Sequence, residues 1–206
     1  MPVFSENFES TGVADDAFTN DWDGPNGTPF SLTSGSGHLL NPAGTGNAWL
    51  NPVPSALGEI FAALHSGGTA EANTGQTFTA GLEYTLTFTQ FRRDDWSGNP
   101  VEASIGDSDG PLASVDFPAV TATDTFITRT VDYTATIEDA GRDIFLRFVD
   151  SDGGTSLNQV AMDNIELTAV PEPASGTTAL IGLSGLIALA MRRRGKQKGS
   201  GFSFCD

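Results

Sequence analysis

Residues 82–91 read LEYTLTFTQF, and this stretch decides the fold class. Apolar side chains at Leu82, Tyr84, Leu86 and Phe88 alternate with threonines at positions 85, 87 and 89. The residue types are strong β-formers. A period of two over ten positions predicts a β-strand with one face in a core and the other toward solvent.

Similar short segments lie on both sides of this strand, separated by Gly, Pro, Asn and Asp. They read FSENFES, TPFSLT, GHLLN, NAWLN and EIFAAL before it, and PVEASIGD, PLASVDF, FITRTVDYTAT, RDIFLRFVD and QVAMDNIELTAV after it. About ten short strands at this spacing predict an all-β protein, specifically a jelly-roll β-sandwich, which we place at residues 1–168.

Charge is unevenly distributed along the 206 residues. The first 170 carry 24 of the 26 acids and five of the ten bases, a net charge of −19, and the remainder carries +3. A domain this acidic repels phosphate backbones, so we expect no nucleic-acid partner. Its charge suits divalent cations or an extracellular setting.

Few residues offer thiolate or imidazole chemistry. Cys205 is the single cysteine, which excludes an intrachain disulfide and a thiolate metal site. The two histidines, His38 and His65, occupy unrelated sequence contexts. A zinc site or a histidine-based triad is therefore not predicted.

Two acidic turns share a composition, GDSDG at Gly106–Gly110 and DSDGG at Asp150–Gly154. A hairpin turn is the simpler interpretation, because Asp-Gly tolerates left-handed backbone. Calcium binding is the alternative, although neither stretch has the spacing of an EF-hand loop.

The C-terminal part has a different character. Prolines on both sides of one glutamate form a stiff spacer after the last predicted strand: Pro171, Glu172 and Pro173. An uncharged run follows and predicts an apolar helix over 178–191, near the length that spans a bilayer. A basic cluster then predicts a cytoplasmic end: Arg192, Arg193 and Arg194.

This order of spacer, apolar helix and arginine cluster resembles the PEP-CTERM sorting signal of Gram-negative bacteria, here over residues 169–197. The resemblance implies a single C-terminal transmembrane helix, recognition by an exosortase, removal of the helix and delivery to the cell surface or medium. Lys196–Asp206 runs beyond the usual end of the signal. We expect residues 198–206 to be an unstructured tail. The start MPVFSENFES has no basic or apolar export signal, and we expect one to be encoded upstream of Met1.

The domain has a resemblance of its own, to galactose-binding-like jelly rolls and the carbohydrate-binding modules that share this fold. It rests on Asn7-Phe8-Glu9 near the start and Met162–Leu167 in the last strand. The resemblance implies that these strands lie close together and that Glu9 and Asp163, with Glu6, hold a structural Ca²⁺. The alternative is that Asp163 only satisfies backbone groups at a strand end.

A sugar site needs an exposed aromatic platform beside hydrogen-bonding groups. Trp96 lies in RRDDWSGN, a polar stretch that predicts a loop. We expect Trp96 to form a sugar-binding edge there together with Arg92, Asp94 and Asp95. The alternative is that Trp96 simply covers one end of the sandwich. Of the other tryptophans, residue 49 favours the core and residue 22 is compatible with either place.

The sequence contains no G-x-S-x-G, HExxH or phosphate-loop motif, so we predict that the protein is not an enzyme. We predict an exported surface or extracellular protein that binds glycan within extracellular polysaccharide. Its expected partners are an exosortase, the membrane through the C-terminal helix, and that polysaccharide. The alternatives are a matrix protein without a discrete sugar site and, least favoured, a glycoside-active enzyme.

Overall fold

The computed structural model describes residues 2–13, 17–20, 22, 28–41, 60–92, 96–122, 125–152 and 158–171. These ranges hold eleven strands and one short 3₁₀ helix, η1 (Glu9–Thr11), and no α-helix. The strands are β1 (Pro2–Glu6), β2 (Ala17–Thr19), β3 (Phe30–Asn41), β4 (Phe61–Thr77), β5 (Leu82–Phe91), β6 (Ser97–Gly98), β7 (Val101–Asp107), β8 (Gly110–Phe117), β9 (Ile127–Thr134), β10 (Asp143–Asp150) and β11 (Asn158–Pro171).

Residues Met1–Val170 form one compact unit, which contains the hydrophobic core. Pro171 ends β11 and is exposed. The rest of the predicted sorting signal, with its apolar helix at 178–191, lies outside the described residues. Within the ranges that are described, no helix has the length and apolar character needed to cross a membrane.

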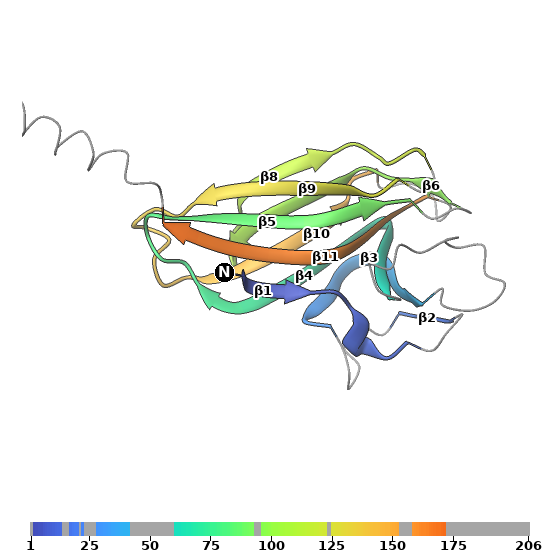
Figure 1. Cartoon of the computed structure of the whole chain (residues 1–206), viewed down its shortest axis with the longest axis horizontal. Helices are drawn as coiled ribbons and strands as arrows, with labels where there is room; N and C mark the ends of the chain where they lie inside the picture. The colour runs from blue at the N-terminus through green and yellow to red at the C-terminus, as the bar shows by residue number, and fades with distance from the viewer. Residues whose placement is uncertain are drawn as a thin grey trace, which may run out of the picture. The chain divides into compact units, whose positions relative to one another are not determined.

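The long strand β4 joins two layers of sheet. One edge of β4 pairs first with β11, through Ala62–His65, and then with β10, through Thr69–Thr77. The strand order β8-β7-β10-β4-β11-β5-β9 therefore places β11, β5 and β9 in one layer and β10, β7 and β8 in the other. Figure 1 shows β5, β9 and β11 in front of β10 and β4, which confirms the predicted β-sandwich.

The stretch that decided the fold class forms β5 as predicted. Tyr84, Leu86 and Phe88 are buried, and the threonines between them are only partly covered. Phe88 contacts Phe148 of β10 edge-to-face, with ring centres 5.0 Å apart, so the core fills the space between the layers. Trp22 also belongs to this core at 2% exposure, which settles its place.

Strands β3 and β4 are longer than their sequence pattern indicates. The predicted segments TPFSLT and GHLLN form one strand, β3, and the segment predicted to end at Leu64 continues as β4 to Thr77. Their pairing shifts register between Leu32 and Ser36. A bulge, rather than a turn, therefore accounts for the glycines in this region.

Candidate functional site

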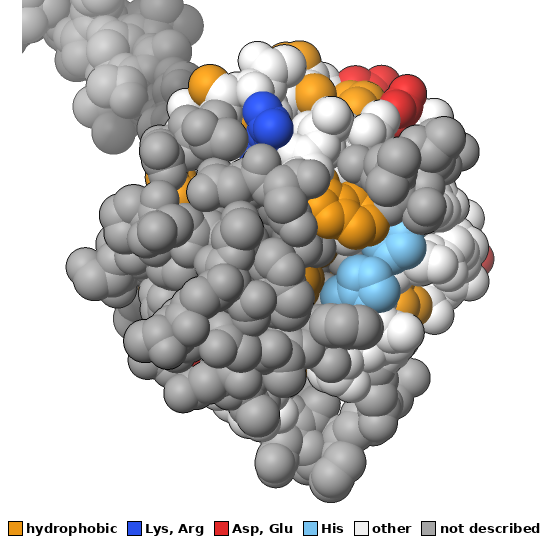
Figure 2. Space-filling view, turned by 90° about the vertical axis from the view of Figure 1, so that its right-hand side faces the viewer, with side chains coloured by type: hydrophobic (Ala, Val, Ile, Leu, Met, Phe, Trp, Pro, Cys, Tyr) orange, Lys and Arg blue, Asp and Glu red, His pale blue; other side chains and the backbone are white. Residues whose placement is uncertain are grey.

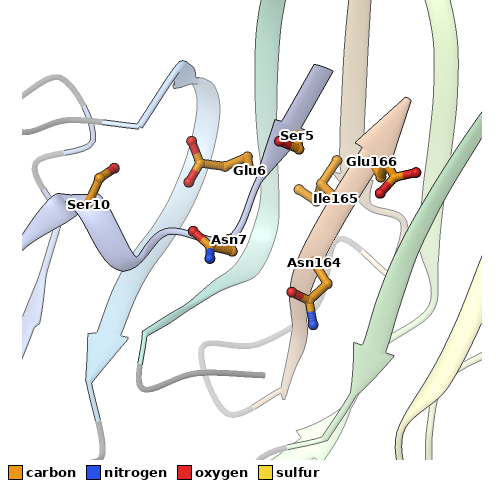
Figure 3. A pocket seen from close by; sticks show the side chains of 7 residues that line it. All are labelled: Ser5, Glu6, Asn7, Ser10, Asn164, Ile165 and Glu166. Atoms are coloured by element: carbon orange, nitrogen blue, oxygen red, sulfur yellow. The ribbon is translucent and has the colours of Figure 1, made fainter. Parts of the chain in front are cut away.

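The first and last strands lie side by side, as the resemblance implied. β1 pairs antiparallel with β11, with Glu6 opposite Ile165. Between them is a pocket of about 350 Å³, to which the end of β1, η1 and β11 contribute side chains (Figure 3). The lining residues are Ser5, Glu6, Asn7, Ser10, Asn164, Ile165 and Glu166.

Asp163 directly precedes Asn164, which lines this pocket, and its side chain is fully buried. Its Oδ1 accepts a hydrogen bond from the Asn164 backbone N–H at 2.6 Å, whereas its Oδ2 has no hydrogen-bond partner. Burial is the main cause that raises the pKa of Asp163 to about 8, and the charges of Glu9 and Glu6 contribute to this rise. Burial also raises the pKa of Glu6. A carboxylate in this place needs either a proton or a cation.

The oxygen-only donors at this point suit a hard cation such as Ca²⁺. Glu9 already accepts a hydrogen bond from the Ile60 N–H at 2.8 Å through Oε1. Among the described residues, no three His, Cys, Asp or Glu side chains are grouped to hold a metal ion. A Ca²⁺ ion bound to Asp163 would therefore take part of its shell from backbone carbonyls and water. The alternative, that Asp163 only satisfies backbone groups at a strand end, accounts for the hydrogen bond to its Oδ1. It does not account for the buried Oδ2 that has no hydrogen-bond partner.

The acidic turn GDSDG is a hairpin turn, as the simpler interpretation held. Asp107 pairs with Gly110 at the end of β7, and its Oδ1 accepts the Asp109 N–H at 2.8 Å. Its Oδ2 lies 2.6 Å from Arg142 Nη1. The hydrogen bond from Arg142 is the main cause that holds the pKa of Asp107 below its usual range.

In the second acidic turn, Asp150 is buried and organises the backbone around it. It accepts hydrogen bonds from Asn99 Nδ2 at 2.8 Å, from the Asp152 N–H at 3.3 Å and, through Oδ2, from the Gly67 N–H at 3.3 Å. Residues 153 and 154 lie outside the described residues. Asp150 thus connects this turn to the middle of β4.

Trp96 lies partly buried just before β6. Arg92 supports this loop, because its Nε donates to the Trp96 carbonyl at 2.6 Å and its Nη1 donates to the Thr121 carbonyl at 2.7 Å. Of the predicted sugar-binding edge, the structure thus brings Arg92 and Trp96 together. Asp94 and Asp95 lie outside the described residues.

The neighbour of Trp96 is a histidine. Gln159 pairs with Gly98 of β6 and with His65 of β4, which places the Trp96 and His65 rings 6.0 Å apart between centres. His65 is 8% exposed and lies against His38, with 2.7 Å between the two Nε2 atoms. The two histidines lie in unrelated sequence contexts, yet the fold brings them together as a pair. Antiparallel pairing of β3 with β4 brings residues 27 positions apart together.

The histidine pair borders a pocket of about 450 Å³. Figure 2 shows both histidines at the surface, beside a patch of hydrophobic side chains. The pocket is lined by Asn20, Leu32, Gly35, Ser36, Gly37, His38 and His65. It therefore combines imidazole, amide and hydroxyl groups with apolar surface, which is the general composition of a small-ligand site.

The bulge in β3 and β4 positions this pair. Ser66 and Gly67 have left-handed backbone, with φ of 55° and 72°. A Cβ on Gly68 would lie 2.1 Å from the Ser36 carbonyl oxygen, so the two strands approach more closely here than any side chain would allow. Ser66 accepts an unfavourable conformation for a non-glycine residue, and its Oγ lies 3.2 Å from His65 Nδ1. The sequence signal was the Ser-Gly-Gly that follows His65.

Several solved structures have a similar fold. The Stig cyclase Fisc from Fischerella sp. TAU, in complex with an indole derivative, is 20% identical at a TM-score of 0.63, covering 82% of this chain and 98% of its own. Arabinose-bound MgGH51 α-L-arabinofuranosidase is 12% identical at 0.53, covering 82% and 27%. The CBM22-1 xylan-binding domain of Paenibacillus barcinonensis Xyn10C is 9% identical at 0.45, covering 83% and 96%. Only the first two TM-scores are high enough to compare folds, and at these identities they support the β-sandwich alone.

No curated protein sequence matches the chain. Residues 169–194 match the PEP-CTERM protein-sorting motif, which confirms the resemblance of the tail. This motif implies processing by an exosortase and anchoring at the C-terminus. The chain thus carries the signal of a secreted, cell-surface-sorted protein of Gram-negative bacteria, joined to an all-β sandwich.

Proposed function

We propose that this protein is a non-catalytic glycan-binding module of the extracellular polysaccharide, which an exosortase releases from, or attaches at, the cell surface. The observation that carries the glycan-binding part is the position of Trp96. Trp96 is partly exposed, and its ring centre lies 6.0 Å from that of His65, which itself lines the pocket with polar neighbours; Trp96 and these neighbours make up the proposed rim. Sugars stack on aromatic faces and use their hydroxyls for hydrogen bonds, and this rim offers both kinds of contact.

Specific groups are available to sugar hydroxyls at this rim. Asn20 and Ser36 provide an amide N–H₂ and a hydroxyl, and the rings of His38 and His65, whose nitrogens already have partners, line the pocket beside them. Arg92 binds two backbone carbonyls, so its role in this proposal is to hold the Trp96 loop in place. The first alternative, a matrix protein without a discrete sugar site, needs no such rim. The second, a glycoside-active enzyme, would need a dedicated pair of carboxylates.

Binding of residues 1–171 to an array of bacterial and plant polysaccharides tests the proposal. Trp96→Ala should lower affinity about fivefold to 150-fold, if a sugar ring on the indole contributes about the 1–3 kcal/mol known for a base stacked on an aromatic side chain. Ile137→Ala is the matched control, because Ile137 is 81% exposed and lies in the turn after β9, away from Trp96. If no glycan binds, or if both variants bind like wild type, the matrix role replaces the binding role.

Sorting has its own test. The processed protein should lack the apolar run at 178–191, with cleavage close to Pro171-Glu172-Pro173. Intact-mass measurement of protein recovered from the cell surface or medium reads this directly. A recovered form that keeps the run at full mass would exclude proteolytic processing.

Ca²⁺ is the cofactor that we propose for the domain. Asp163 would provide the central carboxylate oxygen, with backbone carbonyls and water in the rest of the shell, because Glu6, Glu9 and Asp163 do not form a three-carboxylate group in the described residues; the ion would neutralise charge where β1 meets β11. It would act by tying the two ends of the domain together, with no part in a reaction. The partnerless Asp163 Oδ2 is the observation that supports it.

A further inference from the structure

We propose that His38 and His65 form a binding site for a divalent transition-metal ion, with Cu²⁺ bound most tightly, through their Nε2 atoms at the bulge between β3 and β4. The site is separate from the oxygen donors at Asp163. It also stands or falls independently of glycan binding, because its argument uses only the two imidazoles and their neighbours.

The two rings meet through the nitrogens that bind metals. Their Nε2 atoms are 2.7 Å apart while the ring centres are 4.6 Å apart, so both nitrogens lie between the two rings. The ring planes differ by 27°. In the metal-free state this is a hydrogen bond from one imidazole to the other, with a proton between two nitrogen lone pairs.

The remaining ring nitrogens have the partners that metal-binding histidines use. His38 Nδ1 contacts the side-chain oxygen of Asn20, which accepts only, so Nδ1 carries the proton and Nε2 keeps its lone pair. His65 Nδ1 lies 3.2 Å from Ser66 Oγ, which both donates and accepts. Moving the His65 proton from Nε2 to Nδ1 therefore leaves Nε2 of both rings available without net loss of a proton. Such outer partners orient ligating imidazoles.

The choice of metal follows from the ligand type. Imidazole nitrogens bind Cu²⁺ more tightly than Zn²⁺, and two nitrogens about 2.0 Å from one ion are about 2.8 Å apart at the right angle of square-planar Cu²⁺. The present 2.7 Å between the two Nε2 atoms is set by their hydrogen bond, so only a small change in separation is needed. The rings must turn so that their lone pairs converge on the adjoining pocket of about 450 Å³, which has room for the ion and its water ligands.

Affinity should be moderate. Among the described residues, no third His, Cys, Asp or Glu joins the pair to make a group of three, and the proposal needs only the two imidazoles with water. The net charge of −19 over the first 170 residues favours any divalent cation, and imidazole ligands then favour Cu²⁺ over Zn²⁺. We expect a dissociation constant in the micromolar range, which rises in acid because protons compete with the ion for the imidazole nitrogens.

Calorimetric titration of residues 1–171 with Cu²⁺ at pH 7 tests this, with the electron paramagnetic resonance spectrum read on the same samples. This segment excludes Cys205, because a thiol is a ligand type that would compete for copper. Wild type should bind one Cu²⁺ with hyperfine structure from two imidazole nitrogens, and Zn²⁺ should bind at least tenfold more weakly. His38→Gln and His65→Gln should each lower Cu²⁺ affinity at least tenfold. Asn20→Ala should weaken it several-fold, and Asn73→Ala, an exposed asparagine on β4, should not.

Circular dichroism establishes that each variant is folded. If His65→Gln unfolds, His38→Gln carries the test, because His38 is less buried. Cu²⁺ affinity and spectrum that stay unchanged in the His38→Gln domain would overturn the proposal, as would a folded wild type that binds no Cu²⁺. The glycan result does not enter either outcome.

Discussion

Replacing Asp163 by asparagine should stabilise the domain in calcium-free buffer and remove its response to Ca²⁺. In the folded state the pKa of Asp163 is about 8, compared with an ordinary value of 3.8. The folded state therefore binds this proton more tightly than the unfolded chain does between about pH 4 and pH 8. Stability should fall as the pH rises through that window and then level off.

The magnitude follows from one proton. Each pH unit inside the window costs about 1.4 kcal/mol, so at pH 7 the wild-type carboxyl destabilises the fold by about 4 kcal/mol. Asparagine removes this penalty but buries an amide N–H₂ where Oδ2 had no partner, which costs about 1–3 kcal/mol. The net gain in EDTA is about 2 kcal/mol, or a rise in Tm of about 4–8 °C for a domain of this size.

Calcium should reverse the order. At one hundred times its Kd, an ion that binds only the folded wild type stabilises it by about 2.7 kcal/mol, while Asp163→Asn should gain almost nothing. Mg²⁺ should do less than Ca²⁺, because it demands octahedral geometry and resists dehydration. The assay is thermal unfolding of residues 1–171 in EDTA, Ca²⁺, Mg²⁺ and Na⁺ of matched ionic strength.

Asp116→Asn is the matched control, since it makes the same charge change at an exposed position on β8. It should leave both the Tm in EDTA and the Ca²⁺ response close to wild type. An Asp163→Asn domain that is less stable than wild type in EDTA would refute the pKa argument. Equal Ca²⁺ shifts in wild type and Asp163→Asn would show that the ion binds elsewhere.

Two further predictions concern the scaffold. Gly68→Ala should lower the free energy of unfolding in urea by about 3 kcal/mol, because its Cβ would lie 2.1 Å from the Ser36 carbonyl oxygen. Gly75→Ala is the control: its added Cβ meets nothing within 4 Å, so it should cost only the about 1–2 kcal/mol of a left-handed backbone. Equal costs for the two variants would contradict the close approach of the strands at the bulge. Burial, with a hydrogen bond to Asp139, raises the pKa of Tyr133 to about 12. The folded state therefore keeps the phenol proton to higher pH than the unfolded chain, and the free energy of unfolding should fall between about pH 10 and pH 12. Tyr133→Phe should abolish this fall in the same urea assay.

The strands were predictable because their signal is local. Alternation in residues 82–91 depends only on neighbours along the chain, and β5 has the predicted buried and exposed faces. The meeting of β1 with β11 followed from a resemblance at both ends of the domain rather than from any local pattern.

The histidine pair was not predictable in this way. His38 and His65 meet only because one register joins β3 to β4, and that register depends on the bulge at Ser66–Gly68. Glycines there read as turn residues, since nothing local distinguishes a bulge from a turn. For the same reason the loop of Trp96 was predictable but its neighbour His65 was not.

Binding of the folded domain to polysaccharide from the producing bacterium tests the central claim most directly. Residues 1–171 are mixed with that purified polysaccharide and sedimented, with Trp96→Ala and Ile137→Ala measured alongside. The account predicts that wild type and Ile137→Ala co-sediment in a saturable way while Trp96→Ala stays in the supernatant. Wild type that stays in the supernatant, or Trp96→Ala that sediments as wild type does, would contradict it.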